Sequence, residues 1–146
     1  MKKLIPSYHQ LLDRLTDFPL LVIRLTLAYG FYEPAKMKLF NINNIISWFS
    51  EMGLPFPTLN AYMATATEVV GVVCLILGLG VRYITIPLII TMLVAIKTVH
   101  WENGFSAGEN GFEIPFYYIV FLISLLIWGA GKFSIDHFIE KKNIRS

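Results

Sequence analysis

Charged residues are scarce in this sequence, because only 15% of its 146 residues are Asp, Glu, Lys or Arg, whereas 55% are hydrophobic. Water-soluble domains typically carry about 25% charged and about 45–50% apolar residues. This deficit argues against a water-soluble enzyme. Four membrane spans of about 20 residues each would use more than half of the chain and leave no room for a second globular domain. The composition therefore predicts a small membrane protein with one domain over residues 1–146.

Other absences exclude further classes of protein. The single cysteine, Cys74, can form neither an intramolecular disulfide nor a C-x-x-C redox pair. The net charge of +2, without a concentrated basic face, does not suit a nucleic-acid partner. The sequence contains no paired metal-ligand motif, no nucleophile triad and no phosphate-binding glycine loop, so no metal site is predicted and the question of enzymatic activity stays open.

Four apolar stretches predict transmembrane helices at about residues 18–39, 59–80, 83–101 and 114–131. The last is the cleanest, because no charged side chain occurs between Ile114 and Gly131. Helices are expected because a backbone in lipid must satisfy its own hydrogen bonds. The turn between the second and third stretches is so short that they must form an antiparallel hairpin. The predicted fold is an all-α membrane protein, an antiparallel bundle of four transmembrane helices.

Positive charges predict the orientation of this bundle. Most of the 12 Lys and Arg residues lie before the first span, between the second and third, or after the fourth. The positive-inside rule then predicts an inner-membrane protein with both termini in the cytoplasm. Residues 1–17 are expected to form a short cytosolic or interfacial helix rather than a signal peptide, because charged residues interrupt them and no small-residue cleavage site follows.

The connections outside the spans also have distinct patterns. Ile42, Ile45, Ile46 and Phe49 recur at helical spacing, which predicts a short interfacial helix over residues 42–52 between the first two spans. The loop over residues 102–113 is rich in Gly and Asn, which favours turns rather than a helix. Apolar and charged residues interleave after Gly131, which predicts a surface amphipathic helix at the C-terminal end.

Several ionisable side chains fall within or beside the spans, where each costs roughly 2.5–3.5 kcal/mol at the helix centre. Such side chains normally face the bundle interior and pair with one another. The predicted buried polar cluster, in the outward-facing half of the bundle, consists of Glu33, Lys36, Glu68, Lys97, His100 and Glu113. Glu68 lies near mid-membrane, and Lys97 and His100 are one turn apart and share a helical face. Arg24, nearer the cytoplasmic end, is expected to serve structure, against the second span or lipid headgroups.

Two interpretations of this cluster stay open. In the first, pairing of Glu68 with Lys97 or with Arg24 only holds helices together, and His100 is an interfacial histidine bonded to the loop. In the second, the cluster forms a pocket for a flat aromatic ligand such as a quinone headgroup, or a proton-conducting or metal-contacting group. Aromatic residues at similar depth would supply the walls of such a pocket: Tyr29, Tyr32, Trp101, Tyr117 and Tyr118.

The chain resembles the DoxX family of small four-helix bacterial membrane proteins over about residues 20–136. The resemblance rests on an ordered set of segments: Arg24, Lys38-Leu39-Phe40, Trp48-Phe49 with Gly53-Leu-Pro55, Ala66-Thr-Glu68 with Gly71, Leu77-Gly-Leu-Gly-Val-Arg82, Val94-Ala95 with Thr98-Val99-His100, Asn103-Gly104-Phe105, Asn110-Gly111-Phe112-Glu113-Ile-Pro115 and Gly131-Lys132-Phe133-Ser134-Ile-Asp136. Two further segments, Phe31-Tyr-Glu-Pro-Ala35 and Thr98-Val-His-Trp101, are similar to the HvfX-like subgroup, whose members accompany the maturation of small copper-binding peptides.

The resemblance implies a membrane subunit of redox and quinone-linked systems, of sulfur oxidation or of oxidative-stress complexes. No catalytic residue is carried over from the family. Many relatives have a histidine or small residues where this chain has Glu33-Pro34, so a role for that histidine does not transfer. The fold also looks like that of quinone-coupled thiol oxidases, but this chain lacks their cysteine pairs, so that chemistry cannot be its own.

Two functions follow as hypotheses. The first is an auxiliary or quinone-linked subunit of a redox or oxidative- or metal-stress system, in which Glu68, Lys97 and His100 hydrogen-bond a quinone and relay protons. The alternative is a non-catalytic membrane scaffold, or a maturation or transport partner for copper-binding peptides. Either function implies that the chain lies in the lipid bilayer. Either also implies a membrane or periplasmic redox or metal-handling protein as a partner.

Overall fold

The computed structural model describes residue 15 and residues 17–144, and within them the protein is all-helical, without a strand. Four longer helices form the body of the molecule: α2 (Asp17–Phe40), α4 (Pro57–Leu77), α5 (Val81–Ala95) and α6 (Glu113–Trp128). Two shorter helices accompany them, α3 (Ile42–Glu51) and α7 (Ile135–Ile144). The helix expected over residues 1–17 lies almost entirely outside the described residues.

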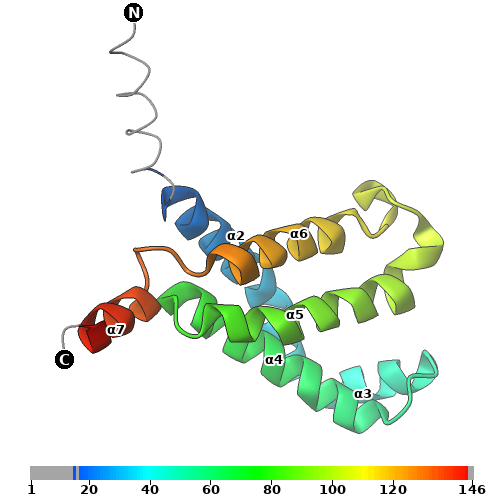
Figure 1. Cartoon of the computed structure of the whole chain (residues 1–146). Helices are drawn as coiled ribbons and strands as arrows, with labels where there is room; N and C mark the ends of the chain where they lie inside the picture. The colour runs from blue at the N-terminus through cyan, green and yellow to red at the C-terminus, as the bar shows by residue number, and fades with distance from the viewer. Residues whose placement is uncertain (1–14, 16, 145–146) are drawn as a thin grey trace, which may run out of the picture.

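The four longer helices pack side by side around one apolar core. α5 lies between α4 and α6, while α2 packs mainly against α4 and also touches α6 (Figure 1). The core contains side chains from each of the four: Leu27 and Phe31 of α2, Leu75 of α4, Leu88 of α5 and Leu122 of α6. α3 and the loop between α5 and α6 lie at one end of the body, and α7 lies at the other (Figure 1).

α4 and α5 form a tight hairpin. Only three residues connect them, and Gly78 and Gly80 adopt positive φ angles of 68° and 59°, which side chains rarely tolerate. Farther from the hairpin turn, a Cβ atom on Gly71 of α4 would lie 2.9 Å from a methyl carbon of Leu88 on α5. The absence of a side chain at Gly71 therefore sets the close approach of these two helices.

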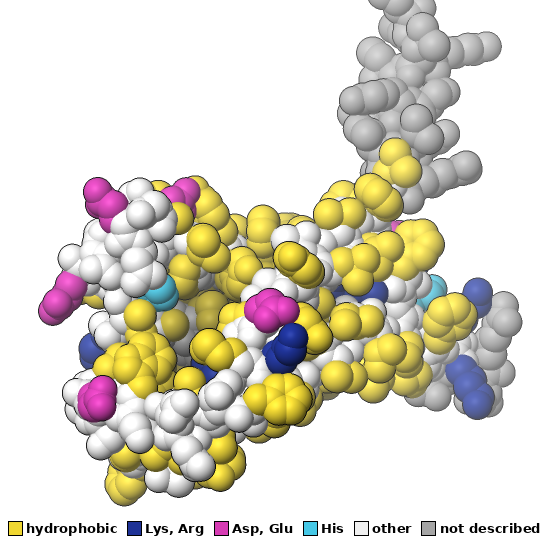
Figure 2. Space-filling view, turned by 180° about the vertical axis from the view of Figure 1, so that it is seen from behind, with side chains coloured by type: hydrophobic (Ala, Val, Ile, Leu, Met, Phe, Trp, Pro, Cys, Tyr) yellow, Lys and Arg dark blue, Asp and Glu magenta, His cyan; other side chains and the backbone are white. Residues whose placement is uncertain are grey.

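Two helical segments are long and apolar enough to cross a membrane: Pro57–Leu77, and the continuous stretch Val81–Asn103 that begins with α5. Only 33% and 17% of their most apolar stretches is buried within the chain, unlike the core helices of soluble proteins. Their outward sides expose Val70, Val73, Ile86 and Ile90. Hydrophobic side chains also dominate the face of the molecule seen in Figure 2. Both segments thus present an apolar exterior.

The other two predicted spans differ from expectation. α6 covers Glu113–Trp128 rather than residues 114–131, because Gly129 and Gly131 adopt positive φ angles of 80° and 75° that end the helix. Its 16 residues rise about 24 Å, less than the roughly 30 Å of a bilayer's hydrocarbon core. α2 is long enough with 24 residues, but it carries Arg24, Glu33, Lys36 and Lys38.

The third predicted span is not a regular α-helix at its C-terminal end. The α-helix stops at Ala95 and continues as a π-helical turn over Ile96–His100, followed by a 3-10 turn over Trp101–Asn103. The predicted turns of the following loop are present, with a further 3-10 turn at Ala107–Glu109. The short helix predicted over residues 42–52 is found as α3, and the predicted C-terminal helix as α7.

Candidate functional site

A cavity of about 700 Å³ lies between α2, α3, α4, α5 and the loop that precedes α6. Most of the side chains around it are apolar, and its aromatic residues are Phe31, Trp48, Phe49 and Tyr118. A small number of side chains bring polar atoms to the wall: Lys38, Asn60, Thr67, Glu68, Thr91, Thr98, His100 and Asn110. An apolar pocket with a few convergent polar groups is typical of a site for a small molecule.

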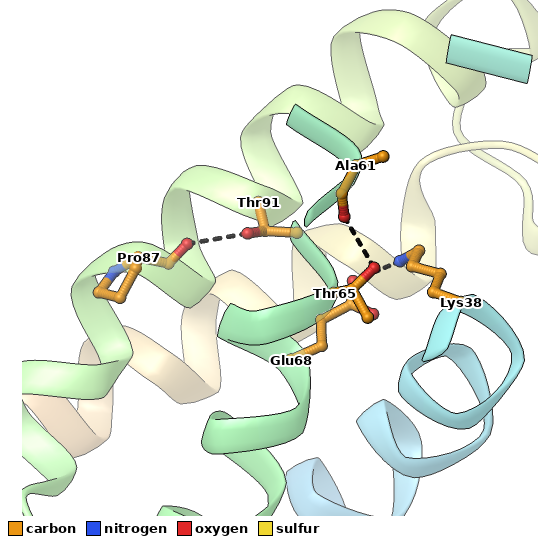
Figure 3. A network of polar contacts seen from close by, with 6 residues as sticks. All are labelled: Lys38, Ala61, Thr65, Glu68, Pro87 and Thr91. Carbon is orange, nitrogen blue, oxygen red and sulfur yellow. Dashed lines mark hydrogen bonds and ion pairs between the residues drawn. The ribbon is translucent and has the colours of Figure 1, made fainter. Parts of the chain in front are cut away.

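The central polar feature of this wall is an ion pair between α2 and α4. The Nζ of Lys38 donates a hydrogen bond to Oε1 of Glu68 over 2.5 Å. Glu68 is only 1% exposed, and 14% of the Lys38 side chain is exposed. Figure 3 shows the Lys38 ammonium group reaching across from α2 to the carboxylate on α4. Two charges in so apolar a place stabilise each other only as a pair.

This pair corrects the prediction for Glu68. Its partner is neither Lys97 nor Arg24, because Lys38 is the cation that lies beside it. The Lys97 side chain is exposed and makes no hydrogen bond or ion pair with any described residue. Lys97 belongs to the π-helical turn, whose wider winding ends the α-helical face that Lys97 and His100 were expected to share.

Glu33 and Lys36 do not line the cavity either. Their side chains are 71% and 50% exposed, and their nearest charged atoms are 3.9 Å apart. Lys36 also lies over the ring of Tyr32, with its Nζ 5.7 Å from the ring centroid. The buried face of α2 contains Arg24, Leu27, Phe31 and Ala35, so helical rotation directs Glu33 and Lys36 outward.

Glu113 and His100 form hydrogen bonds that fix the loop between α5 and α6. Glu113 accepts hydrogen bonds from the Ala107 N–H at 2.9 Å and from the Tyr117 hydroxyl at 3.1 Å. The Nδ1 of His100 lies 2.8 Å from the carbonyl oxygen of Asn110, as in the interpretation of His100 as an interfacial histidine bonded to the loop. Of the six residues predicted to cluster, only Glu68 and His100 line the cavity.

The sequence contained a signal that identifies Lys38. Arg24, Phe31 and Lys38 are spaced by seven residues, which is close to two helical turns, so they share one face of α2. Arg24 and Phe31 are almost completely buried. Lys38 therefore continues the buried face of α2.

Arg24 lies far from the cavity, at the α7 end of the body, and is 2% exposed. Its guanidinium group donates to three backbone carbonyls: Leu75 of α4 at 2.8 Å, Ala130 at 2.7 Å and Phe133 at 2.8 Å. A Cβ atom on Gly78 would lie 2.5 Å from its Nη1, so this glycine makes room for the guanidinium group. Arg24 thus joins α2 to α4 and to the segment between α6 and α7.

The polar groups of the site are hydrogen-bonding groups. Among residue 15 and residues 17–144, no three His, Cys, Asp or Glu side chains gather as they would around a metal ion. The cavity combines aromatic walls, an ammonium group and a carboxylate. That set can hold a flat, mostly apolar molecule with a polar end, and can exchange protons with it.

Two helical segments that are long and apolar enough to cross a membrane, with largely unburied apolar sides, fit a membrane-associated protein. Residues 19–101 match the sequence model of the DoxX family, and the chain belongs to this family, whose members are membrane-associated. A Haemophilus influenzae protein named "Uncharacterized protein" is 34% identical over 130 residues, which cover 84% of this chain and 83% of that protein. The "Putative oxidoreductase CatD" of Bacillus subtilis is 26% identical over 121 residues, 83% of this chain and 87% of that protein. No solved structure gives a significant match.

Proposed function

We propose that this chain is a multi-pass inner-membrane protein, a single domain in which α2, α4, α5 and α6 form an antiparallel bundle of four spans. Family membership and the apolar exterior of the helices support this arrangement. α6 and its flanking residues would span a locally thinned bilayer, which costs only a fraction of a kcal/mol per Å of mismatch.

Charge at the two ends of the body supports cytoplasmic termini. The end that carries α7 contains Arg82, Lys132, Lys141 and Lys142. Toward the opposite end, with α3 and the loop before α6, the basic residues are Lys36, Lys38 and Lys97, and residues 102–113 contain neither Lys nor Arg. Positively charged segments stay on the cytoplasmic side, so α7 and the start of α2 face the cytoplasm and the cavity lies in the outer half.

We propose further that the cavity binds a lipid-soluble quinone-type carrier, and that the protein serves as an auxiliary, quinone-linked membrane subunit of a redox system. The observation that carries this proposal is the buried Lys38–Glu68 pair in the wall of an otherwise apolar cavity. A quinone ring is apolar on its faces and polar only at its two oxygens. Lys38 can donate a hydrogen bond to such an oxygen, while Glu68 beside it can accept or release a proton.

The surroundings of the pair suit a flat ring. Phe31 and Tyr118 meet edge to face with their ring centroids 5.3 Å apart, and both line the cavity together with Trp48 and Phe49. The cavity volume falls within the roughly 300–1,000 Å³ of small-molecule sites. The similarity to the "Putative oxidoreductase CatD" of Bacillus subtilis supports a redox role. The side chains around the cavity do not form a redox centre of their own. A partner protein therefore carries out the electron transfer.

The test is saturable quinone binding by the full chain in lipid nanodiscs. A short-chain quinone is titrated while tryptophan fluorescence is recorded, since Trp48 lines the cavity. The native chain should quench saturably above the linear background caused by partition into lipid. The K38M variant should weaken binding by about tenfold, the effect of one charge-assisted hydrogen bond.

Matched controls come from the exposed ion pair of the same helix. K36M and E33Q remove the same chemical groups within two turns of Lys38, but outside the cavity, and should bind like the native chain. Quenching that stays linear in the native chain would overturn the proposal. So would equal losses in K38M and in the exposed variants. The double variant K38M/E68Q, which leaves no unpaired charge, provides a folded comparison if a single variant fails to fold.

A further inference from the structure

We infer that the cavity selects a ligand head that carries a phenolic hydroxyl group, so that it takes the reduced quinol in preference to the oxidised quinone. This inference rests on the proposed quinone site and specifies the redox state that the site favours. It concerns binding alone.

The inference starts from one unsatisfied oxygen. Glu68 Oε1 accepts the hydrogen bond of Lys38, but Glu68 Oε2 is buried and has no hydrogen-bond partner among the described residues. An ionised carboxylate is an acceptor only, so Oε2 needs a donor. A buried acceptor that remains unpaired is costly, because it has lost its hydrogen bonds to water. A ligand that supplies the missing donor relieves this cost on binding.

Three threonine hydroxyl groups nearby are already committed. Thr65 donates to the Ala61 carbonyl at 2.7 Å, Thr91 to the Pro87 carbonyl at 3.0 Å, and Thr98 to the Val94 carbonyl at 2.8 Å. Each threonine has one hydroxyl hydrogen, and each donates it to a backbone carbonyl one turn earlier in the same helical segment. Figure 3 shows Thr65 on α4, the helix that carries Glu68, and Thr91 on α5, with these bonds drawn. Lys38 supplies Glu68 with a cation, while no described residue donates a hydrogen bond to its Oε2.

A hydroxyl group matches both members of the pair. Its hydrogen can be donated to Glu68, while its oxygen accepts from one of the N–H groups of Lys38 that Glu68 does not use. A quinone carbonyl only accepts hydrogen bonds, so it can bind Lys38 but leaves the second oxygen of Glu68 unpaired. It also places two acceptors, the carbonyl oxygen and the Glu68 carboxylate, next to each other. Oε2 itself is enclosed, so a ligand reaches it after the carboxylate rotates about its terminal torsion, which has a broad and shallow profile.

The wall of the cavity favours an aromatic hydroxyl over an aliphatic one. Phe31, Trp48, Phe49 and Tyr118 offer ring faces and edges against which a flat ring packs better than a flexible chain. A lipid headgroup with an aliphatic hydroxyl shares the donor chemistry but not the ring. These two sources of the hydroxyl group are separated by the choice of probes.

The experiment uses three redox-inert probes with similar apolar tails on the full chain in nanodiscs. The first is a prenylated 4-methoxyphenol, the second is its dimethoxy analogue without a donor, and the third is a long-chain alcohol. Dissociation constants are measured by tryptophan fluorescence. The native chain should bind the phenol about tenfold more tightly than the dimethoxy probe, the effect of one good hydrogen bond to a charged group. The alcohol should bind more weakly than the phenol.

E68Q and E33Q identify the source of the discrimination. The amide of E68Q supplies both a donor and an acceptor, so the phenol and the dimethoxy probe should bind E68Q within about threefold of each other. E33Q removes an exposed carboxylate and should keep the native ratio. If the native chain binds phenol and dimethoxy probe equally, the inference is wrong while the quinone site stands. If the alcohol binds as tightly as the phenol, the aromatic preference is wrong. If no probe and no quinone binds saturably, the proposed function fails as well.

Discussion

The carboxylate of Asp136, in the first turn of α7, caps the N-terminus of α5. Its Oδ1 accepts from the Gly80 N–H at 2.8 Å and its Oδ2 from the Val81 N–H at 3.2 Å. The Asp136 N–H in turn donates to the Gly78 carbonyl at 3.0 Å. The first N–H groups of a helix have no partner within the helix, and Gly80 has no side chain to supply one. Asp136 therefore joins α7 to the hairpin between α4 and α5.

Removal of this cap should destabilise the end of the body that carries α7. D136A is expected to lower the free energy of unfolding by about 1–2 kcal/mol, and D136N by less, because an amide oxygen still accepts a hydrogen bond. The measurement is denaturant unfolding of the full chain in detergent micelles. E140A, an exposed carboxylate of the same helix, is the control and should behave like the native chain. An equal effect of D136A and E140A would show that the cap contributes nothing.

Arg24 should be irreplaceable even by lysine. Its guanidinium group serves three carbonyls in different directions, and a single ammonium group cannot reproduce that fork. R24K and R24M should each lower the free energy of unfolding by about 2–4 kcal/mol, because buried carbonyl oxygens lose their donors. Arg82 makes one hydrogen bond to the Ile127 carbonyl at 3.2 Å and is exposed, so R82K should change stability by less than about 0.5 kcal/mol. Full stability of R24K would refute this role.

Lys38 and Glu68 should show strong energetic coupling. K38M or E68Q alone removes the partner of a buried polar group and should cost about 3–5 kcal/mol, whereas the double variant should be more stable than either single one. K97M is the matched control, because its ammonium group is exposed and should combine additively with E68Q within about 0.5 kcal/mol. A double-mutant cycle from unfolding curves checks both statements. Additive losses for K38M and E68Q would show that the two residues do not stabilise each other.

Asp17 and Lys132 should make stability depend on pH in the acidic range. Asp17 lies just outside the proposed span of residues 18–39, and its Oδ2 is 2.8 Å from Lys132 Nζ. The hydrogen bond from the Lys132 side chain holds the pKa of Asp17 below its ordinary value of 3.8. A lowered pKa means that the carboxylate contributes stability above pH 3.8 and loses that contribution as the pH falls through the lowered value.

The effect is checked by unfolding at neutral pH and across the acidic range. The native chain should lose more stability on acidification than D17N, which cannot be protonated. The effect should be modest, because the Lys132 side chain is 63% exposed. E140Q tests for a general effect of acid, because it removes an exposed carboxylate of α7. Identical acid profiles for the native chain and D17N would contradict the prediction.

Helix positions could be predicted well because they depend on local composition. The apolar runs coincide with α4 and with the long segment that begins at Val81, and the spacing of Ile42, Ile45 and Ile46 identified α3. The ends were less predictable. The helix of the third span changes to a π-helical turn at Ile96, and α6 stops at Trp128, because backbone angles at these points depend on the loops that follow.

Pairing could not be predicted in the same way. The ionisable residues near the spans were recognised from their cost in lipid, and Glu68 is indeed buried. Its partner depends on how α2 is rotated and how far it slides along α4, and no local pattern states either quantity. Glu33, Lys36 and Lys38 lie within six residues, yet only Lys38 faces Glu68.

The sequence by itself determined that this protein is helical, apolar on its outside and unable to carry out thiol–disulfide chemistry with a cysteine pair of its own. Those properties follow from the kinds and periodicity of residues along the chain. Only the tertiary structure decided that Lys38 meets Glu68, that Arg24 joins three segments, and that one carboxylate oxygen remains without a donor. Each of these contacts links residues far apart in the chain, and burial removes the water that would otherwise satisfy them.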